Sequence, residues 1–179
     1  MLNYKTIADA AGTDQSTAKS WPRILERLGI VFYLHPYSND MLKRMVTKHK
    51  LYFYDCGLVA YLTKWSDSNT LMNGAMSGAI LENFVVSEIV KSYQNCGREA
   101  FIYYYRDKDT KEIDVLLEDN GKLYPIEIKK TATPQSQLTR VFGVIDKASL
   151  KRGTGAVLCT TDKLSVFDSW NLIVPIWRI

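Results

Sequence analysis

The dipeptide Asn120-Gly121 constrains the fold of this chain most, because it predicts where two strands reverse direction. Asn and Gly both tolerate the positive φ angles of the tight type I′ turn that joins antiparallel strands. The flanking runs, 112–118 and 123–130, are rich in Ile, Val and Leu, as strands are. The sequence therefore predicts a β-hairpin with a two-residue turn.

A two-residue turn sets the register of the hairpin, and side chains alternate between its two faces. One face is expected to be apolar, with Ile113 opposite Ile128, Val115 opposite Ile126 and Leu117 opposite Tyr124. On the other face we expect Asp114 opposite Glu127 and Glu112 opposite Lys129. The register thus predicts two adjacent carboxylates and a lysine on one face.

Adjacent carboxylates repel each other, and a divalent cation between them removes the repulsion. Magnesium favours oxygen ligands of this kind. The Lys129 ammonium would stabilise an attacking water or the charge that develops on a phosphate. Asp114 and Glu127 are therefore candidate magnesium ligands, and together with Lys129 they are candidate catalytic residues for phosphodiester hydrolysis.

A solvated polar face is the alternative interpretation of these residues, with Glu112 paired to Lys129. Charged outer faces are common on half-buried strands. A three-residue bulged loop would also shift the register and separate the two carboxylates. The spacing alone leaves these alternatives open.

Asp114 followed by Glu127-Ile128-Lys129 resembles the D…ExK core of the PD-(D/E)xK nuclease superfamily. Three further motifs surround it: GAILENF at 78–84, YYR at 104–106 and EID at 112–114. Together the motifs resemble the uncharacterised C-terminal domain that follows the ATPase core in many bacterial and archaeal AAA-type ATPases. The resemblance covers nearly the whole chain, and it implies a winged helix followed by a nuclease-like domain.

The resemblance also implies a role for Glu82, because nuclease-like folds often supply a third carboxylate from the helix before the sheet. Glu82 is therefore a further candidate catalytic residue and metal ligand. The alternative is a surface charge near the first turn of a helix, where the helix dipole favours it. The implied partner is an N-terminal ATPase domain of the same full-length protein.

The positive charge of the chain lies in its N-terminal part. Residues 1–50 hold 8 Lys and Arg against 4 Asp and Glu, whereas residues 51–179 hold 15 of each. The formal net charge of +4 suits a polyanionic partner such as nucleic acid. Helical spacing over 4–11 and about 16–28, then strand-like runs at 30–34 and 51–54, follow the order of a winged helix.

The second helix of a DNA-binding helix-turn-helix enters the major groove, where its polar residues meet base edges. The alternative is a structural or protein-docking winged helix whose polar face is only solvated. The candidate DNA contacts are Gln15, Ser16, Lys19 and Arg23 on this helix, with Lys43 and Arg44 in the wing.

A turn-rich stretch at 66–74 predicts a domain boundary near residue 72, between a winged-helix module, 1–72, and a nuclease-like domain, 73–179. The second part is expected to be an α/β fold, a restriction-endonuclease-like mixed sheet flanked by helices. Its expected elements are a helix over 79–93, a strand over 100–105, the hairpin, a helix after Pro134 and a strand over 155–160. Because Pro175 interrupts the apolar run 171–179, we expect an edge strand there.

Composition excludes several classes of protein. No apolar run approaches the roughly 20 residues needed to span a bilayer, and the N-terminus lacks a signal-peptide pattern. The three cysteines show neither a disulfide framework nor zinc-ligand spacing, so we expect reduced thiols in a cytoplasmic protein. Two functions stay open: a magnesium-dependent DNA endonuclease, or a non-catalytic DNA- or protein-binding module that regulates an attached ATPase. Oligomerisation also stays open.

The sequence predicts that this chain by itself has no ATP site. Its single Gly-Lys pair, Gly121-Lys122, precedes Leu123 and lacks the glycine-rich loop that cradles phosphates in a P-loop. Calorimetric titration of the 179-residue chain with ATP and magnesium should therefore show no binding. Tight, magnesium-dependent binding would contradict the interpretation of this chain as an ATPase appendage.

Overall fold

The computed structural model describes residues 3–37, 48–65, 67–109 and 111–179. Its helical elements are α1 (Tyr4–Ala11), α2 (Gln15–Arg27), α3 (Cys56–Leu62), α4 (Ser68–Asn73), α5 (Ser77–Asn95) and the 3-10 segments η1 (Ser136–Lys147) and η2 (Ile176–Arg178). The strands are β1 (Val31–Pro36), β2 (Lys50–Phe53), β3 (Ile102–Arg106), β4 (Glu112–Asp119), β5 (Lys122–Lys129), β6 (Lys151–Arg152), β7 (Gly155–Cys159), β8 (Ser165–Asp168) and β9 (Asn171–Pro175).

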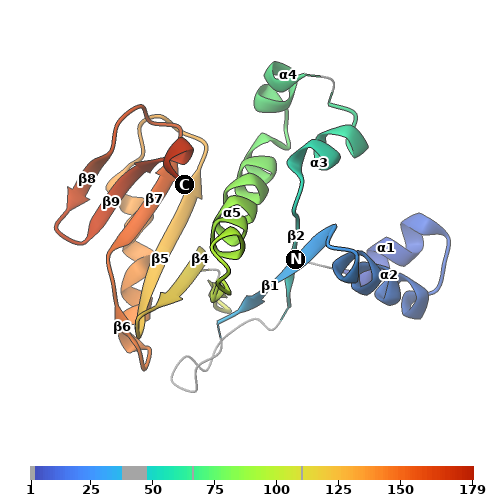
Figure 1. Cartoon of the computed structure of the whole chain (residues 1–179), viewed down its shortest axis with the longest axis horizontal. Helices are drawn as coiled ribbons and strands as arrows, with labels where there is room; N and C mark the ends of the chain where they lie inside the picture. The colour runs from blue at the N-terminus through green and yellow to red at the C-terminus, as the bar shows by residue number, and fades with distance from the viewer. Residues whose placement is uncertain (1–2, 38–47, 66, 110) are drawn as a thin grey trace.

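These elements form a mixed α/β fold with N-terminal helices and a large mixed sheet (Figure 1). Within the described residues the sheet has nine strands, in the order β2-β1-β3-β4-β5-β7-β9-β8, with β6 paired to β5 outside this path. Among the same residues, no helix is long and apolar enough to cross a membrane.

Helix α2 begins after an aspartate. The Asp14 carboxylate accepts hydrogen bonds from the backbone N–H groups of Ser16 and Thr17, each at 2.9 Å. The helix therefore begins at Gln15, close to the start at about residue 16 that the helical spacing predicted. The N-cap residue directly precedes the first turn of a helix, and Asp14 occupies this position in α2.

The apolar positions that predicted α2 do not lie in the core. Trp21, Ile24 and Leu28 expose 39%, 53% and 66% of their surface, and the buried residues of the helix are Ala18 and Pro22. The helical spacing correctly indicated a helix.

The ribbon of β1 and β2 continues the main sheet. The two strands pair antiparallel, and β1 also pairs parallel with β3 through His35 with Tyr103 and Pro36 with Tyr104. Backbone hydrogen bonding therefore runs without interruption across the domain boundary that we placed near residue 72. In Figure 1, helices α1 and α2 lie beyond this ribbon, away from β4 and β5.

The predicted hairpin of β4 and β5 is confirmed, and so is its register from the turn as far as Val115 with Ile126. Asn120 and Gly121 have φ angles of 49° and 70°, as the tight turn requires. The ladder extends from Asp119 with Lys122 to Val115 with Ile126, as the two-residue turn predicts.

A β-bulge in β4 makes the expected single apolar face wrong. Tyr103 pairs with Leu116 but Tyr105 pairs with Ile113, so β4 has one more residue than β3 between these pairs. An extra residue reverses the alternation of side chains. Ile113 therefore packs with Leu116 in one cluster, whereas Val115 packs in the other.

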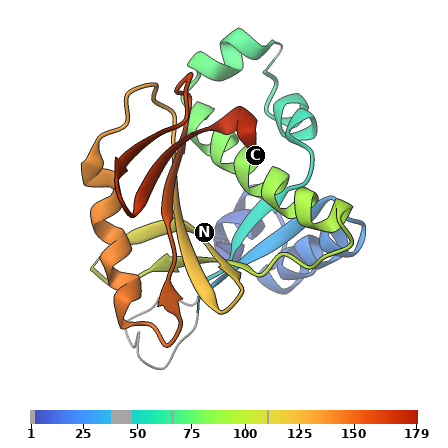
Figure 2. The same cartoon turned by 60° about the vertical axis from the view of Figure 1, so that its left-hand side comes forward.

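The two clusters lie on opposite faces of the sheet, under α5 and η1 respectively (Figure 2). The helix expected after Pro134 is the 3-10 segment η1, which contributes Phe142 and Ile145 to its cluster. The expectation of an edge strand at 171–179 is wrong, because β9 lies between β7 and β8. Pro175 is the last residue of β9, where a missing N–H costs little.

Asn83 of α5 holds the edge strand β2. Its side-chain amide accepts a hydrogen bond from the Phe53 N–H at 2.8 Å and donates one to the Phe53 carbonyl at 2.9 Å. Asn83 is buried, so these bonds replace the water or strand that an edge otherwise needs. They fix β2 against α5, and both elements contribute to the site described below.

We expect Asn83→Ala to destabilise the protein, because it leaves both backbone groups of Phe53 without their partner. The free energy of unfolding, measured by urea denaturation, should fall by about 1–3 kcal/mol. Asn69→Ala, at an exposed position of α4, is the matched control and should change it little. A similar loss in both variants would contradict the role of Asn83 at the strand edge.

Candidate active site

Asp114 lies where the β4–β5 ladder ends. The last backbone pair is Val115 with Ile126, so Asp114 and Glu127 do not form the directly opposed pair that we expected. Instead, Asp114 Oδ2 accepts a hydrogen bond from the Ile128 N–H at 2.9 Å. A side-chain carboxylate thus binds the next strand in place of a backbone carbonyl, because the bulge has turned β4 away from its ladder.

Asp114 and Glu127 are two buried acids with raised pKa values. Burial raises the pKa of Asp114 to about 7; the negative charges of Glu127 and Glu82 add to this effect, and the Ile128 N–H opposes it. Burial also raises the pKa of Glu127, against the hydrogen bond and charge of Lys129. The Glu127 charge thus makes the charged form of Asp114 less favourable, and the Glu112 charge does the same for Glu127.

Glu127 has one oxygen in use and one free within the described part of the chain. Lys129 Nζ lies 2.8 Å from Glu127 Oε1, so the two residues form an ion pair along β5. Glu127 Oε2 is buried and has no hydrogen-bond partner among the described residues. Buried polar atoms without partners are rare in folded proteins, and one beside a second carboxylate suits a bound cation.

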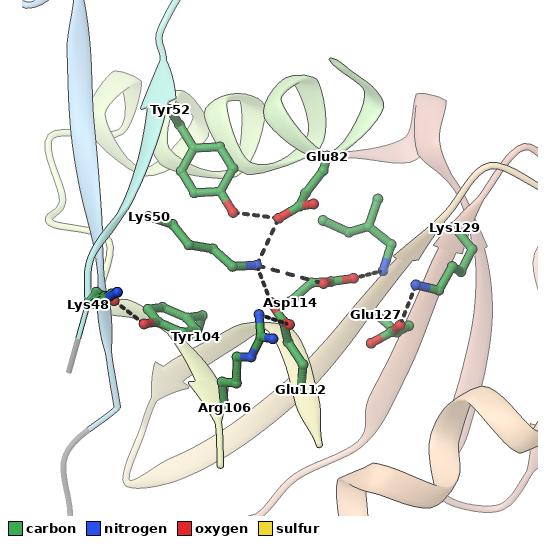
Figure 3. A network of polar contacts seen from close by, with 11 residues as sticks. Lys48, Lys50, Tyr52, Glu82, Tyr104, Arg106, Glu112, Asp114, Glu127 and Lys129 are labelled. Atoms are coloured by element: carbon green, nitrogen blue, oxygen red, sulfur yellow. Dashed lines mark hydrogen bonds and ion pairs between the residues drawn. The ribbon is translucent and has the colours of Figure 1, made fainter. Parts of the chain in front are cut away.

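A second group of charges surrounds Lys50, at the start of β2 (Figure 3). Its ammonium lies 2.8 Å from Glu112 Oε1, 2.9 Å from Glu82 Oε1 and 3.9 Å from Asp114 Oδ1. Two further contacts complete it: Tyr52 donates a hydrogen bond to Glu82 Oε1 at 2.6 Å, and Arg106 pairs with Glu112 Oε2 at 3.1 Å. We call these six residues the Lys50 network.

The charges of the Lys50 network stabilise one another. Burial lowers the pKa of Lys50, but the Glu82 charge and the Glu112 hydrogen bond outweigh it and raise the pKa overall. Burial raises the pKa of Glu82, but Lys50 and the Tyr52 hydroxyl outweigh it and lower the pKa overall. Lys50 therefore stays an ammonium and Glu82 a carboxylate at neutral pH.

The structure brings all four predicted catalytic residues, Asp114, Glu127, Lys129 and Glu82, into one region of polar contacts (Figure 3). Glu112 contacts Lys50 and Arg106, while Lys129 contacts Glu127, in place of the Glu112–Lys129 pair of our alternative interpretation. Lys50, Tyr52 and Arg106 were not among the site residues that the sequence predicted. Lys50 and Tyr52 alternate on β2 as residues of one face do, but nothing local indicated which helix they meet.

A cavity of about 350 Å³ borders the Lys50 network. Lys50, Tyr52, Glu82, Arg106 and Glu112 all line it. A ligand can therefore reach the network from this side.

The candidate metal ligands Asp114, Glu127 and Glu82 differ in how well they fit magnesium. Among the described residues, no group of three or more His, Cys, Asp or Glu side chains could hold a metal ion. Asp114 and Glu127 do fit a two-carboxylate site, because Glu127 Oε2 has no hydrogen-bond partner within the described part of the chain. Glu82 fits less well as a direct ligand, because its Oε1 atom already binds Lys50 and Tyr52.

Three of the predicted DNA contacts, Gln15, Lys19 and Arg23, line one cavity beside β1 and β2. Ser16 does not line it, and its hydroxyl donates a hydrogen bond to Asp14. Lys43 and Arg44 lie outside the described residues. The polar face of α2 therefore forms the wall of a hollow.

Comparison with known proteins identifies the family. Residues 77–179 match the family model described as "Domain of unknown function (DUF4143)". The chain belongs to the DUF4143 family. Its N-terminal part, residues 1–69, matches a second model, "Domain of unknown function (DUF8612)".

Two mycobacterial proteins are similar to this DUF4143 chain. They are the uncharacterised proteins Mb2031c of Mycobacterium bovis and Rv2008c of Mycobacterium tuberculosis, each 27% identical over 140 residues. The match covers 78% of this chain and 31% of each relative, so the chain spans about a third of their length. No solved structure matches the chain.

The raised pKa of Asp114 predicts how stability depends on pH. The folded state holds the proton more tightly than the unfolded chain, whose value is near 3.8. Protonated Asp114 therefore contributes its full stabilisation to the folded state below about pH 4, and this stabilisation is lost as the pH rises through about 7. Asp114→Asn removes this loss and should be more stable than the wild type by roughly 1–3 kcal/mol at about pH 8.

Urea denaturation at about pH 4 and about pH 8 measures this difference. Asp162→Asn, at an exposed position, is the control and should follow the wild type at both values. Strong destabilisation by Asp114→Asn at the higher pH would show that the hydrogen bond to Ile128 outweighs the charge effect.

Proposed function

We propose that this chain is a DNA-associated, magnesium-dependent phosphodiesterase of the PD-(D/E)xK nuclease type, with Asp114, Glu127 and Lys129 as its site. One observation carries the proposal: a buried pair of carboxylates in which Glu127 Oε2 has no partner among the described residues, while Oε1 lies 2.8 Å from Lys129. Two acids and a lysine are the set that metal-assisted hydrolysis needs.

The order of elements supports this proposal. Helix α5, the antiparallel strands β3 to β5, the helical segment η1 and the parallel strand β7 follow in the order that a restriction-endonuclease-like core requires. The helices α1 and α2 and the β1–β2 ribbon have the order of a winged helix. A bulge next to the catalytic position is also common in enzymes, because it re-aims a side chain.

Each residue has a definite task in the proposed mechanism. Asp114 and Glu127 would hold the cation, with the Ile128 carbonyl as a further oxygen, and the cation would supply Lewis-acid polarisation of the phosphate. Lys129 stabilises the attacking water or the developing negative charge. Glu82 acts through Lys50, because the ammonium that it binds lies 3.9 Å from Asp114 Oδ1. Glu82 is thus a positioning residue in this proposal.

The Lys50 network favours a second candidate function, a non-catalytic module. An ammonium among three carboxylates neutralises that part of the site with the protein's own cation. The same fold would then bind DNA or a protein and regulate an ATPase domain elsewhere in a longer protein. The mycobacterial relatives are long enough for such a domain, since the match covers 31% of each.

Metal titration and DNA cleavage test the proposal together. Magnesium or manganese should raise the melting temperature of the wild type, because a ligand of the folded state stabilises it. Asp114→Asn should lose this increase. Lys129→Ala should keep it but lose cleavage of DNA, because the lysine acts on the reaction and not on the metal.

Lys122→Ala is the matched control, since Lys122 is an exposed lysine at the other end of β5. It should keep both the metal response and the cleavage. If metal stabilises the wild type but no DNA is cut, the non-catalytic module is favoured. If metal leaves the melting temperature unchanged, the nuclease proposal fails.

A further inference from the structure

A second cavity, of about 600 Å³, lies between helices α1 and α2 and the β1–β2 ribbon. Ligand pockets commonly have volumes of this order. The chain segment 48–50 links it to the candidate active site, because Lys48 and His49 line the cavity while Lys50 centres the network. The Tyr104 hydroxyl, donating to the Lys48 carbonyl, anchors this segment to the main sheet (Figure 3).

Positive charges face the cavity from two sides. Lys19 and Arg23 are four residues apart on α2 and therefore lie on one face of the helix. Lys48 lines the cavity from a position two residues before β2. Glu26 is the acidic lining residue, so the described lining, not counting its histidines, has an excess of two positive charges.

Aromatic rings form the wall on the ribbon side. The His35 and His49 rings meet edge to face with centroids 4.5 Å apart, and Tyr33 lies 5.8 Å from His49. His35 and His49 are exposed, so their rings are accessible from the cavity side. Burial and the charge of His35 lower the pKa of His49, against Glu26, so His49 is a neutral ring at physiological pH.

We propose that this cavity holds one nucleotide unit of a single-stranded nucleic acid, with its phosphate against Lys19, Arg23 and Lys48 and its base against His35. Cationic side chains that follow the backbone, together with rings on which bases stack, are the features by which proteins hold single strands. The proposal rests on the DNA association proposed above, and it assigns the strand form and the place of contact.

A duplex fits these features poorly. Paired bases present only their edges in the grooves, so their faces cannot stack on a protein ring. An unpaired base can enter a cavity of this size and expose its face to His35. Lys19 and Arg23, which we expected to contact the major groove, are therefore assigned to an unpaired strand.

Fluorescence anisotropy with a short labelled oligothymidine, in EDTA, tests the proposal without the metal site. The single strand should bind the wild-type chain more tightly than a duplex of the same length. Combining Arg23→Gln with Lys48→Gln should weaken binding about tenfold and flatten its salt dependence. His35→Ala should weaken it about tenfold, and His35→Phe should restore it, because a phenyl ring also stacks.

Lys5→Gln with Arg27→Gln is the matched control, because it removes two exposed charges from α1 and α2 outside the cavity lining. It should change the affinity by no more than about twofold. An equal loss in the control, or equal affinity for single strand and duplex, would overturn the proposal. Displacement of the strand by similar concentrations of thymidine monophosphate would also overturn it, in favour of a free-nucleotide site.

The failures of the two proposals are distinguishable. Asp114→Asn should retain strand binding in EDTA, since Asp114 does not line the cavity. Metal-dependent cleavage without strand binding at this cavity would reject the cavity proposal alone. Strand binding without any metal response would reject the nuclease proposal alone. Melting curves of each variant establish that it is folded.

Discussion

The interaction on which the candidate site depends most is the contact of the Lys50 ammonium with Glu82, Glu112 and Asp114. The Lys50 side chain is only 12% exposed, and buried charges are tolerated only when they are paired. The contact joins β2, α5 and β4, which are distant in the chain. The segments matched by the two different family models thus share one polar network, and β1 and β2 belong structurally to the sheet that carries the site.

The bulge in β4 decides which charges meet. It places Asp114 and Val115 opposite Tyr104, and the ladder with β5 ends at Val115. The free Ile128 N–H then binds the Asp114 carboxylate at 2.9 Å. A regular strand would have placed Asp114 beside Glu127 on the outer face, as we first expected. The irregular strand instead gives Asp114 contacts with Lys50 as well as with β5.

The candidate site and the cavity beside α1 and α2 are connected by one short chain segment, residues 48–50. Lys48 and Lys50 lie on either side of His49, so three consecutive residues connect the two regions. Asn83 holds the same strand through Phe53. A nucleic-acid strand in the cavity would therefore lie beside the segment that positions the Lys50 ammonium. This arrangement suits either proposed function, hydrolysis of a strand or detection of one.

The sequence by itself determined the parts of the structure that depend on local chemistry. Asn120 and Gly121 specify a tight turn, and that turn specifies the hairpin register, because both act within a few residues. Tertiary structure alone decided the bulge, the exposure of Trp21 and the pairing of Lys50 with Glu82, 32 positions apart. These features arise from packing between distant elements. Neither the spacing of apolar residues nor secondary-structure propensity indicates such packing.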